Sequence, residues 1–305
     1  ESLDYVAVFT NLMYLQSWIP SSVYYFSLNA PSWSLSNEMF SLTTTENTLW
    51  TVYGGYNQPF VPLSQRGRFS SFNGESWTNI EFDRNETPFL DFVDITVDPE
   101  NENRIFVSSF AQTGGGNIFS GGGLLEIVDN ELSFFYNSTN SPLNDFQESQ
   151  NQITTRVSGT VFDSNNNLWV TDALGANQLK KLDTNGNWSS IDLGSLQTSS
   201  NTTRETGNIT IDNNNTIWIA TRQNGIYVYN ENGDRKRAFI NQENSGNLPN
   251  LGVRAISIDA NNRVWIGTRE GLVVYNNALN VFNDNFLNAQ PVIIEVNGLG
   301  ERLLG

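Results

Sequence analysis

Residues 252–268 read GVRAISIDANNRVWIGT, and the fold class follows from this stretch. Its first half alternates apolar and polar residues, as a strand with one buried face does, and its second half is another short strand that carries Trp265. The Asn-rich turn between them begins at Asp259. The same pattern occurs twice upstream, as RVSGTVFDSNNNLWVT (156–171) and NITIDNNNTIWIAT (208–221), with the Trp six residues after the Asp each time. The chain is therefore built from an internal repeat.

Two looser copies extend the repeat toward the N-terminus. Phe106 takes the place of the Trp after Asp98 and a longer turn, and Trp50 follows a strand in which Thr44 takes the place of the Asp. The anchor residues lie 56, 63, 49 and 47 residues apart, at Trp50, Phe106, Trp169, Trp218 and Trp265. Two further short strands follow each anchor, joined by turns such as NG and DN that tolerate positive φ. Four strands in every 47–63 residues predict the blades of a β-propeller.

We therefore expect an all-β chain, a β-propeller of four-stranded antiparallel blades. Five explicit blades are predicted at about 33–80, 90–140, 153–195, 205–245 and 250–285, the last one ending in a strand near Val281 and Phe282. Residues 1–32 are expected to supply strands of a partial blade or of the ring closure, and residues 286–305 the first strand of a further blade. The predicted total is six to seven blades, and the alternative is a fragment of a longer protein with two propellers.

The Trp and the Asp that recur in the repeat have distinct predicted roles. We interpret the Trp as a packing residue between blades, because it stands on an alternating strand, and the Asp as a cap that binds backbone N–H groups of the turn. The acidic stretches around Asp98 and Asp183 are interpreted as Asx turns as well, since neither has the ligand spacing of a Ca²⁺ loop. No catalytic residue, cofactor or metal site is predicted.

The charge balance and the missing residue types exclude several classes of function. The chain has 32 Asp and Glu, 16 Lys and Arg, no His and no Cys, which gives a net charge of −16. A triad that contains His, thiolate chemistry and disulfides are therefore excluded. Nucleic acid and anionic membrane surfaces require clustered basic residues, so neither is an expected partner. No apolar stretch reaches the length of a membrane span, so direct membrane insertion is not expected.

Seven side chains are candidate contacts for a protein partner or a glycan. They are Tyr53 and Tyr56 beside the loop GGYNQPF (54–60), Trp77 and Trp188 in fourth-strand positions near the blade rim, and the basic run Arg235, Lys236 and Arg237. Each group has a structural alternative, namely an ordinary long hairpin, packing at the rim, or a charged edge strand that resists pairing. The glycine-rich insertion at 111–123 is predicted to be a flexible surface loop and a candidate partner site.

The repeat also resembles a known family. The segments IDANNRVWIGTREGLVVY and IDNNNTIWIATRQNGIYVY resemble the two-component regulator propeller repeat of Bacteroidota, over residues 90–305 and more loosely over 33–80. The stretches 92–143 and 288–305 are similar to the PorZ-type branch of type IX secretion systems. That branch resembles two seven-bladed propellers followed by a small β-domain.

Resemblance to the PorZ type implies a non-catalytic scaffold outside the cytoplasm, at the cell surface and associated with the outer membrane. It implies protein partners of a surface attachment complex, of the PorU sortase, PorV and PorQ types, and the presentation of anionic lipopolysaccharide. The same repeat also occurs in the periplasmic, oligosaccharide-sensing propeller domain of hybrid two-component histidine kinases, which is the alternative. A propeller glycosidase or lyase is a third hypothesis.

Overall fold

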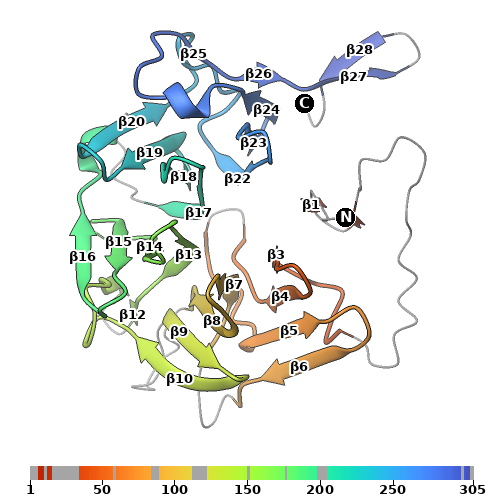
Figure 1. Cartoon of the computed structure of the whole chain (residues 1–305), viewed down its shortest axis with the longest axis vertical. Coiled ribbons are helices and arrows are strands. Elements are labelled where there is room, and N and C mark those ends of the chain that lie inside the picture. The colour runs from red at the N-terminus through yellow and green to blue at the C-terminus, as the bar shows by residue number, and fades with distance from the viewer. Residues whose placement is uncertain are drawn as a thin grey trace. The chain divides into compact units, whose positions relative to one another are not determined.

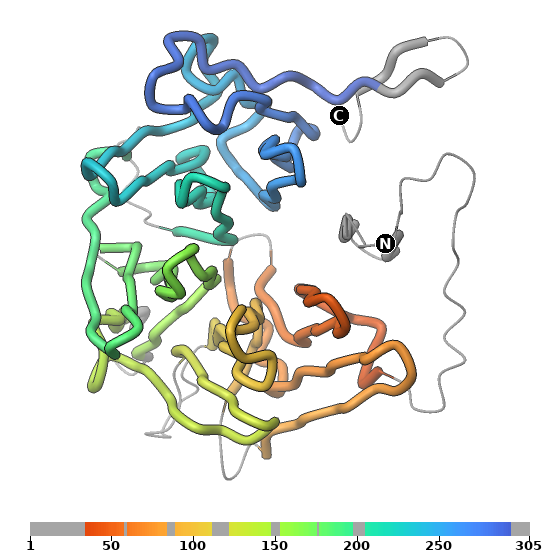
Figure 2. Tube along the Cα trace, in the orientation of Figure 1, coloured from red at the N-terminus to blue at the C-terminus, as the bar shows by residue number. Residues whose placement is uncertain are grey.

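The computed structural model describes residues 6–9, 12–15, 34–57, 60–83, 89–111, 122–149, 152–175, 177–197, 205–296 and 299–302. In this part of the chain the regular elements are strands and two short 3₁₀ helices, η1 (Gly194–Leu196) and η2 (Ala278–Asn280). The chain divides into two compact units, Glu1–Val157 and Ser158–Gly305. Figure 2 shows the trace of the chain coloured in sequence order, from red near the N-terminus to blue near the C-terminus. The prediction of an all-β chain is confirmed.

The described residues contain five four-stranded sheets, which we call blades, and within the first four the strands follow one another in chain order (Figure 1). Blade 1 consists of β3 (Ser41–Thr44), β4 (Leu49–Tyr53), β5 (Arg68–Phe72) and β6 (Trp77–Glu81). Blade 2 consists of β7 (Phe92–Asp98), β8 (Asn101–Ser109), β9 (Gly123–Val128) and β10 (Glu131–Tyr136). A hairpin of β11 (Phe146–Ser149) and β12 (Gln152–Thr154) follows blade 2.

The second unit contains the three blades with the clearest repeat. Blade 3 consists of β13 (Val157–Phe162), β14 (Leu168–Asp172), β15 (Leu179–Leu182) and β16 (Trp188–Ile191). Blade 4 consists of β17 (Thr206–Ile211), β18 (Ile217–Thr221), β19 (Ile226–Asn230) and β20 (Arg235–Phe239). Blade 5 consists of β22 (Val253–Ile258), β23 (Val264–Thr268), β24 (Gly271–Tyr275) and β26 (Gln290–Pro291).

The fourth strand of blade 5 differs from the prediction. We expected it near Val281 and Phe282, but β24 pairs with β26, so blade 5 extends to residue 291. The helix η2 and a following turn occupy the expected position, and Val281 is buried in the core. A short parallel pair, β21 (Ser245–Gly246) with β25 (Leu287–Asn288), then holds the chain before it enters β26. Tertiary packing of this longer connection therefore decides which residues complete the blade.

The predicted total of six to seven blades is also wrong for the described residues, which contain five four-stranded sheets. Near the N-terminus, β1 (Val6–Phe9) pairs with β2 (Leu12–Leu15), and near the C-terminus β27 (Ile293–Val296) pairs with β28 (Leu299–Arg302). In the described part of residues 286–305, β27 thus pairs with β28, where the sequence predicted a single first strand. The segment VYYFSL (23–28), which we expected to contribute a strand to a partial blade or to the ring closure, lies outside the described residues.

The core lies between adjacent blades. Trp218 and Val228 of blade 4 share one cluster of buried side chains with Val264 and Ile266 of blade 5. Trp169 of blade 3 shares another with aliphatic residues of blade 4, and Trp50 of blade 1 shares a third with residues of blade 2. The predicted role of the Trp as a packing residue between blades is therefore confirmed for these three anchors, and burial of such large apolar surfaces stabilises the stack of blades.

Candidate functional site

Each repeated Asp organises its turn with both carboxylate oxygens. In blade 4, Asp212 Oδ1 accepts hydrogen bonds from the backbone N–H groups of Asn214 and Thr216, both at 2.9 Å. Its Oδ2 accepts one from Trp218 Nε1 at 3.2 Å. The same three bonds are formed by Asp163 with Asn165, Asn167 and Trp169, and by Asp259 with Asn261, Arg263 and Trp265. The predicted turn cap is confirmed, and the bond to the indole is an addition that the sequence pattern did not reveal.

These bonds make the turns sensitive to acid. Burial alone would raise the pKa of Asp163, but the hydrogen bonds from Asn167, from Trp169 and from the backbone hold this pKa below its ordinary value. The pKa of Asp259 is lowered in the same way, against the effect of burial, by Trp265 and Arg263. Both carboxylates are therefore bound more strongly in their charged form.

We expect the protein to lose stability as the pH falls through the lowered pKa values of Asp163 and Asp259. A folded-state pKa below that of the unfolded chain, about 3.9 for Asp, contributes stability that is fully present above this value and is lost below it. Urea unfolding at pH 7 and pH 3 measures the difference. The double variant Asp163→Asn, Asp259→Asn should show a smaller difference between the two pH values, and an unchanged difference would contradict the assignment.

A second repeated residue links the turns of neighbouring blades. Asn215 and Asn262 have φ values of 56° and 59°, in the left-handed region where Asn is tolerated. Asn215 Oδ1 accepts a hydrogen bond from Ser164 N–H of blade 3 at 3.0 Å, and Asn262 Oδ1 accepts one from Asn213 N–H of blade 4 at 3.1 Å. Gly would fit this backbone conformation, but only a side chain forms the link. This link therefore gives a structural reason for an Asn at this position of the Asn-rich turns.

The two looser copies replace this arrangement with others. In blade 1, Thr45 and not Thr44 takes the place of the Asp, because Thr45 Oγ1 accepts a bond from Thr48 N–H at 3.2 Å. Its oxygen does not reach the indole, and Trp50 Nε1 is buried without a hydrogen-bond partner among the described residues. In blade 2, Arg104 Nη1 lies 2.9 Å from Asp98 Oδ2, and the guanidinium carbon lies 4.8 Å from the centre of the Phe106 ring. The guanidinium of Arg104 thus binds the Asp of blade 2, as the indole N–H of the Trp does in blades 3 to 5.

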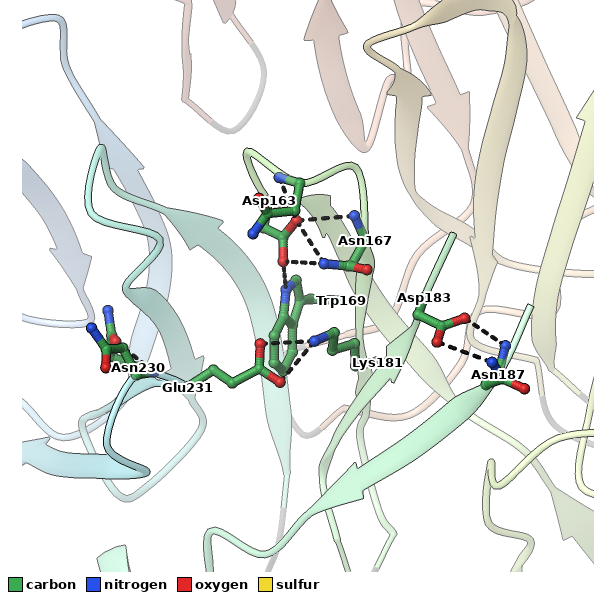
Figure 3. A network of polar contacts seen from close by, with 10 residues as sticks. Asp163, Asn167, Trp169, Lys181, Asp183, Asn187, Asn230 and Glu231 are labelled. Atoms are coloured by element: carbon green, nitrogen blue, oxygen red, sulfur yellow. Dashed lines mark hydrogen bonds and ion pairs between the residues drawn. The ribbon is translucent and has the colours of Figure 1, made fainter. Parts of the chain in front are cut away.

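A polar cleft of about 210 Å³ opens between the turns of blades 3 and 4. Lys181 Nζ of blade 3 lies 2.7 Å from both carboxylate oxygens of Glu231 of blade 4, and 5.3 Å from the centre of the Trp169 ring (Figure 3). Asn230 Nδ2 donates to the carbonyl oxygen of Asn214 at 3.0 Å. The lining residues are Asp163, Asn165, Trp169, Asn214, Asn215, Asn230, Glu231 and Asn232. Amide donors and acceptors beside an indole suit a polar, uncharged ligand.

The two acidic stretches form Asx turns, as interpreted from the sequence. Asp183 Oδ1 accepts hydrogen bonds from Asn185 N–H at 2.9 Å and Asn187 N–H at 2.7 Å, and Asp98 Oδ1 accepts one from Glu100 N–H at 2.9 Å (Figure 3 shows Asp183). The pKa of Asp183 is lowered by the bonds from Asn187. Within the described ranges, no group of three or more Asp and Glu side chains is arranged to hold a metal ion.

Two of the predicted contact residues are not on the surface. Tyr53 is fully buried, and its hydroxyl donates to Ser70 Oγ at 3.0 Å. Trp77 is 8% exposed, and its ring centroid lies 5.1 Å from that of Phe72. Both faces of β4 are buried at its end, so Tyr53 is covered, and the pairing of β5 with β6 places Trp77 opposite Phe72. Neither side chain offers a contact surface, so both predictions are corrected.

The other two aromatic candidates are half-buried. Tyr56 stacks on Phe60 with 4.5 Å between ring centroids and lies 4.6 Å from Phe110, so the loop at 54–60 has an aromatic base. Trp188 is half-buried on β16, opposite Leu182 of β15. Contact with a partner through either residue stays a prediction. Most of the glycine-rich insertion at 111–123 lies outside the described residues.

The basic run on β20 does not form one cationic patch. Arg235 is exposed, and its guanidinium lies 4.6 Å from the centre of the Phe282 ring. Arg237 Nη1 donates to the carbonyl oxygen of Val281 at 2.7 Å, on the side of blade 5. Lys236 lies on the opposite side of the strand and forms an ion pair with Asp234 at 3.0 Å. Alternation along the strand thus separates charges that are adjacent in the sequence.

The blades, their pairing and their repeated turns define an all-β protein of the β-propeller class. Residues 247–270 match the family described as two component regulator propeller. The structure is similar to PorZ, described as an essential bacterial surface component of the type-IX secretion system of Porphyromonas gingivalis, with 18% sequence identity and a TM-score of 0.70 over 89% of this chain. The chain spans 37% of the PorZ chain. In sequence, no curated protein matches it.

The similar structures also include enzymes, of which we give two. The periplasmic gluconolactonase PpgL of Pseudomonas aeruginosa is 14% identical, with a TM-score of 0.54 and coverage of 84% of this chain and 72% of that one. A GH74 enzyme of Niastella koreensis is 14% identical, with a TM-score of 0.52 and coverage of 79% and 37%. The chain is thus a PorZ-like propeller in fold, with a regulator-propeller repeat in its sequence, and the fold alone does not decide between scaffold and enzyme. In the described part of the chain, no helix is long and apolar enough to cross a membrane.

Proposed function

We propose that this protein is a non-catalytic, extracytoplasmic scaffold of a type IX secretion and cell-surface attachment machinery. The observation that carries the proposal is the similarity to PorZ over 89% of the chain. The resemblance of residues 92–143 and 288–305 to the same branch adds to it. The proposal includes a location at the cell surface, and it is supported by the description of PorZ as a bacterial surface component.

The blades suit a docking role because they hold their connecting loops rigidly. Hydrogen bonds between the turns of neighbouring blades, such as that from Ser164 N–H to Asn215, fix one blade on the next. A surface that is ordered before binding loses little conformational entropy when a partner docks. The proposed partners are proteins of the PorU sortase, PorV and PorQ types. Anionic lipopolysaccharide is a proposed ligand, for which the exposed Arg235 is the available member of the basic run.

Deletion of the gene in the source bacterium tests this proposal. We expect secreted cargo proteins to remain unattached to the surface, and the sortase to purify from the outer membrane without its usual partners. A plasmid copy of the gene should restore both. Unchanged cargo attachment and an intact sortase complex in the deletion strain would overturn the proposal, and turnover of a polysaccharide or lactone by the purified protein would replace it with an enzyme.

The match of residues 247–270 to the regulator-propeller family favours a second candidate, the oligosaccharide-sensing domain of a hybrid two-component system. The amide-lined cleft between blades 3 and 4 is the site it would use. Calorimetry with a panel of neutral oligosaccharides tests it. Asn232→Ala should weaken binding about tenfold, equivalent to about 1.4 kcal/mol.

Asn185→Ala is the matched control for that titration. Asn185 also precedes a glycine in a turn between third and fourth strands, but it does not line the cleft. Saturable binding that only Asn232→Ala weakens would support the sensor, whereas equal effects of both substitutions, or no binding to any sugar of the panel, would count against it.

A further inference from the structure

Five Asn-Gly pairs occur in the sequence, and the structure describes four of them, at Asn73, Asn185, Asn224 and Asn232. Asn is a chemically labile residue, because the backbone nitrogen of the next residue can attack its side-chain amide. A following glycine favours this attack, since it has no Cβ to obstruct the approach. Which pair reacts depends on whether its side-chain amide and its glycine N–H are free to meet.

Two of these pairs are restrained by hydrogen bonds of their turns. Asn73 Oδ1 accepts hydrogen bonds from the N–H groups of Glu75 at 3.0 Å and Ser76 at 2.9 Å, which hold the amide in place. Gly186, the glycine that follows Asn185, donates its N–H to the backbone carbonyl oxygen of the Asp three residues before it, at 3.0 Å. In each pair a hydrogen bond must break before the reaction can begin.

Burial separates the remaining two pairs. Asn224 is 1% exposed, and the N–H of Gly225 donates to the carbonyl oxygen of Leu251 at 2.9 Å, so both reacting groups are enclosed. Asn232 and Gly233 are exposed. Within the described ranges, neither the side chain of Asn232 nor the N–H of Gly233 forms a hydrogen bond. Asn232 therefore belongs to the pair whose reacting groups are free.

A cation also lies beside the peptide group that would react. Arg235 Nε donates to the carbonyl oxygen of Asn232 at 3.0 Å, and this carbonyl is bonded to the nitrogen of Gly233. The guanidinium carbon lies 4.6 Å from the centre of the Phe282 ring, a contact that helps to hold the side chain at the turn. Loss of the Gly233 N–H proton leaves negative charge shared by the nitrogen and this carbonyl oxygen. The guanidinium therefore stabilises the attacking form.

We propose that Asn232 is a site of spontaneous deamidation, promoted by Arg235. The Gly233 nitrogen, after loss of its proton to solvent, bonds to Asn232 Cγ, and the bond from Cγ to Nδ2 breaks. Nδ2 takes up a proton from solvent and leaves as ammonia. Water then opens the resulting succinimide ring at one of its two carbonyl carbons, which gives aspartate or isoaspartate. Water is the second reactant, and the net change is an amide replaced by a carboxylate.

The reaction would change the charge of the cleft between blades 3 and 4, because Asn232 is one of its lining residues. The new carboxylate stands next in the chain to Glu231, whose two oxygens already lie 2.7 Å from Lys181 Nζ (Figure 3). A further negative charge makes the cleft less favourable for anionic ligands, and isoaspartate also lengthens the backbone of the turn. The inference holds for a scaffold and for a sensor alike, because it rests on the chemistry of the turn.

Peptide mapping by mass spectrometry tests the proposal on the purified 305-residue protein, after timed incubation at neutral pH. We expect Asn232 to convert at least about fivefold faster than Asn185, equivalent to about 1 kcal/mol, because the hydrogen bond of Gly186 restrains the second site. Isoaspartate at residue 232 should be detected by enzymatic methylation. Conversion of Asn232 that is no faster than that of Asn185 would overturn the proposal, and this comparison requires no variant.

Arg235→Gln tests the role of the cation, with Asn185 of the same molecule as the internal reference. Gln brings no positive charge to the carbonyl, so conversion at Asn232 should slow about fivefold while Asn185 keeps its rate. Lys236→Gln is the matched control, because Lys236 lies on the opposite side of the strand and pairs with Asp234. An unchanged rate at Asn232 in Arg235→Gln, or equal slowing in both variants, would overturn the role of Arg235.

Discussion

Replacement of Trp218 by Ala is expected to lower the free energy of unfolding by about 3–5 kcal/mol. Trp218 is 0% exposed and lies at the centre of the cluster that joins blades 4 and 5. Its ring centroid is 5.4 Å from that of Phe239 and 6.1 Å from that of Tyr275, so truncation removes aromatic contacts from both blades. The cavity that remains is lined by β-strands whose backbones are fixed by hydrogen bonds, so it collapses only in part.

Urea unfolding followed by circular dichroism measures this loss, and Trp265→Ala is its matched control. Trp265 occupies the same register position in blade 5 and bonds to its Asp in the same way, at 2.9 Å, but it is half-exposed. Its truncation should cost only about 1–2 kcal/mol, because less apolar surface returns to water. Equal losses for both variants in the 305-residue chain would show that burial between blades is not what the Trp contributes.

The second large effect is expected for Asp212→Asn, which should cost about 1–3 kcal/mol of stability. Asp212 accepts three hydrogen bonds, two from backbone N–H groups and one from Trp218 Nε1. Asn has a single acceptor oxygen, so its NH₂ group must face either the indole N–H or the turn N–H groups. Either orientation leaves a buried donor without a partner, and this penalty is larger than the value of an average hydrogen bond.

Asp183→Asn provides the control for the cap. Asp183 also accepts two backbone N–H bonds in a turn, but it accepts none from an indole and the turn is exposed. Water can satisfy a group that loses its partner there, so the loss should be clearly smaller than for Asp212→Asn. If the two substitutions had equal effects in urea unfolding, the bond between Asp212 and Trp218 would not be a significant source of stability.

Features encoded within a few residues were predictable from the sequence. The six-residue spacing from Asp to Trp, the turn cap and the five explicit blades all follow from local turn chemistry and from the period of the repeat. The bond from the indole to the Asp lies within the same six residues, but it was not predicted. The turn cap alone already explains why an Asp stands at this position. The link through the left-handed Asn was also not predicted, since its donor lies about 50 residues away, as Ser164 does from Asn215.

The exposure of the candidate contact residues could not be predicted from the local sequence. Tyr53 and Trp77 stand in segments that resemble rim and loop, yet packing within blade 1 buries both. Arg235, Lys236 and Arg237 are adjacent in the chain, yet alternation along β20 places Lys236 on the opposite side from the other two. Exposure depends on which neighbouring strand covers a side chain, and that strand is distant in sequence.

The sequence by itself determined the repeated strands and turns of the five explicit blades, because each blade is a set of short strands whose turns are specified by Asp, Asn and Gly at fixed offsets. Only the tertiary structure decided which residues form the fourth strand of blade 5 and which face of each blade is covered. Trp218 and Trp265 stand in similar local sequences, have the same register and each bond to the repeated Asp, but one is buried and the other is half-exposed. The difference arises from the next blade, which covers Trp218 and which local sequence does not specify.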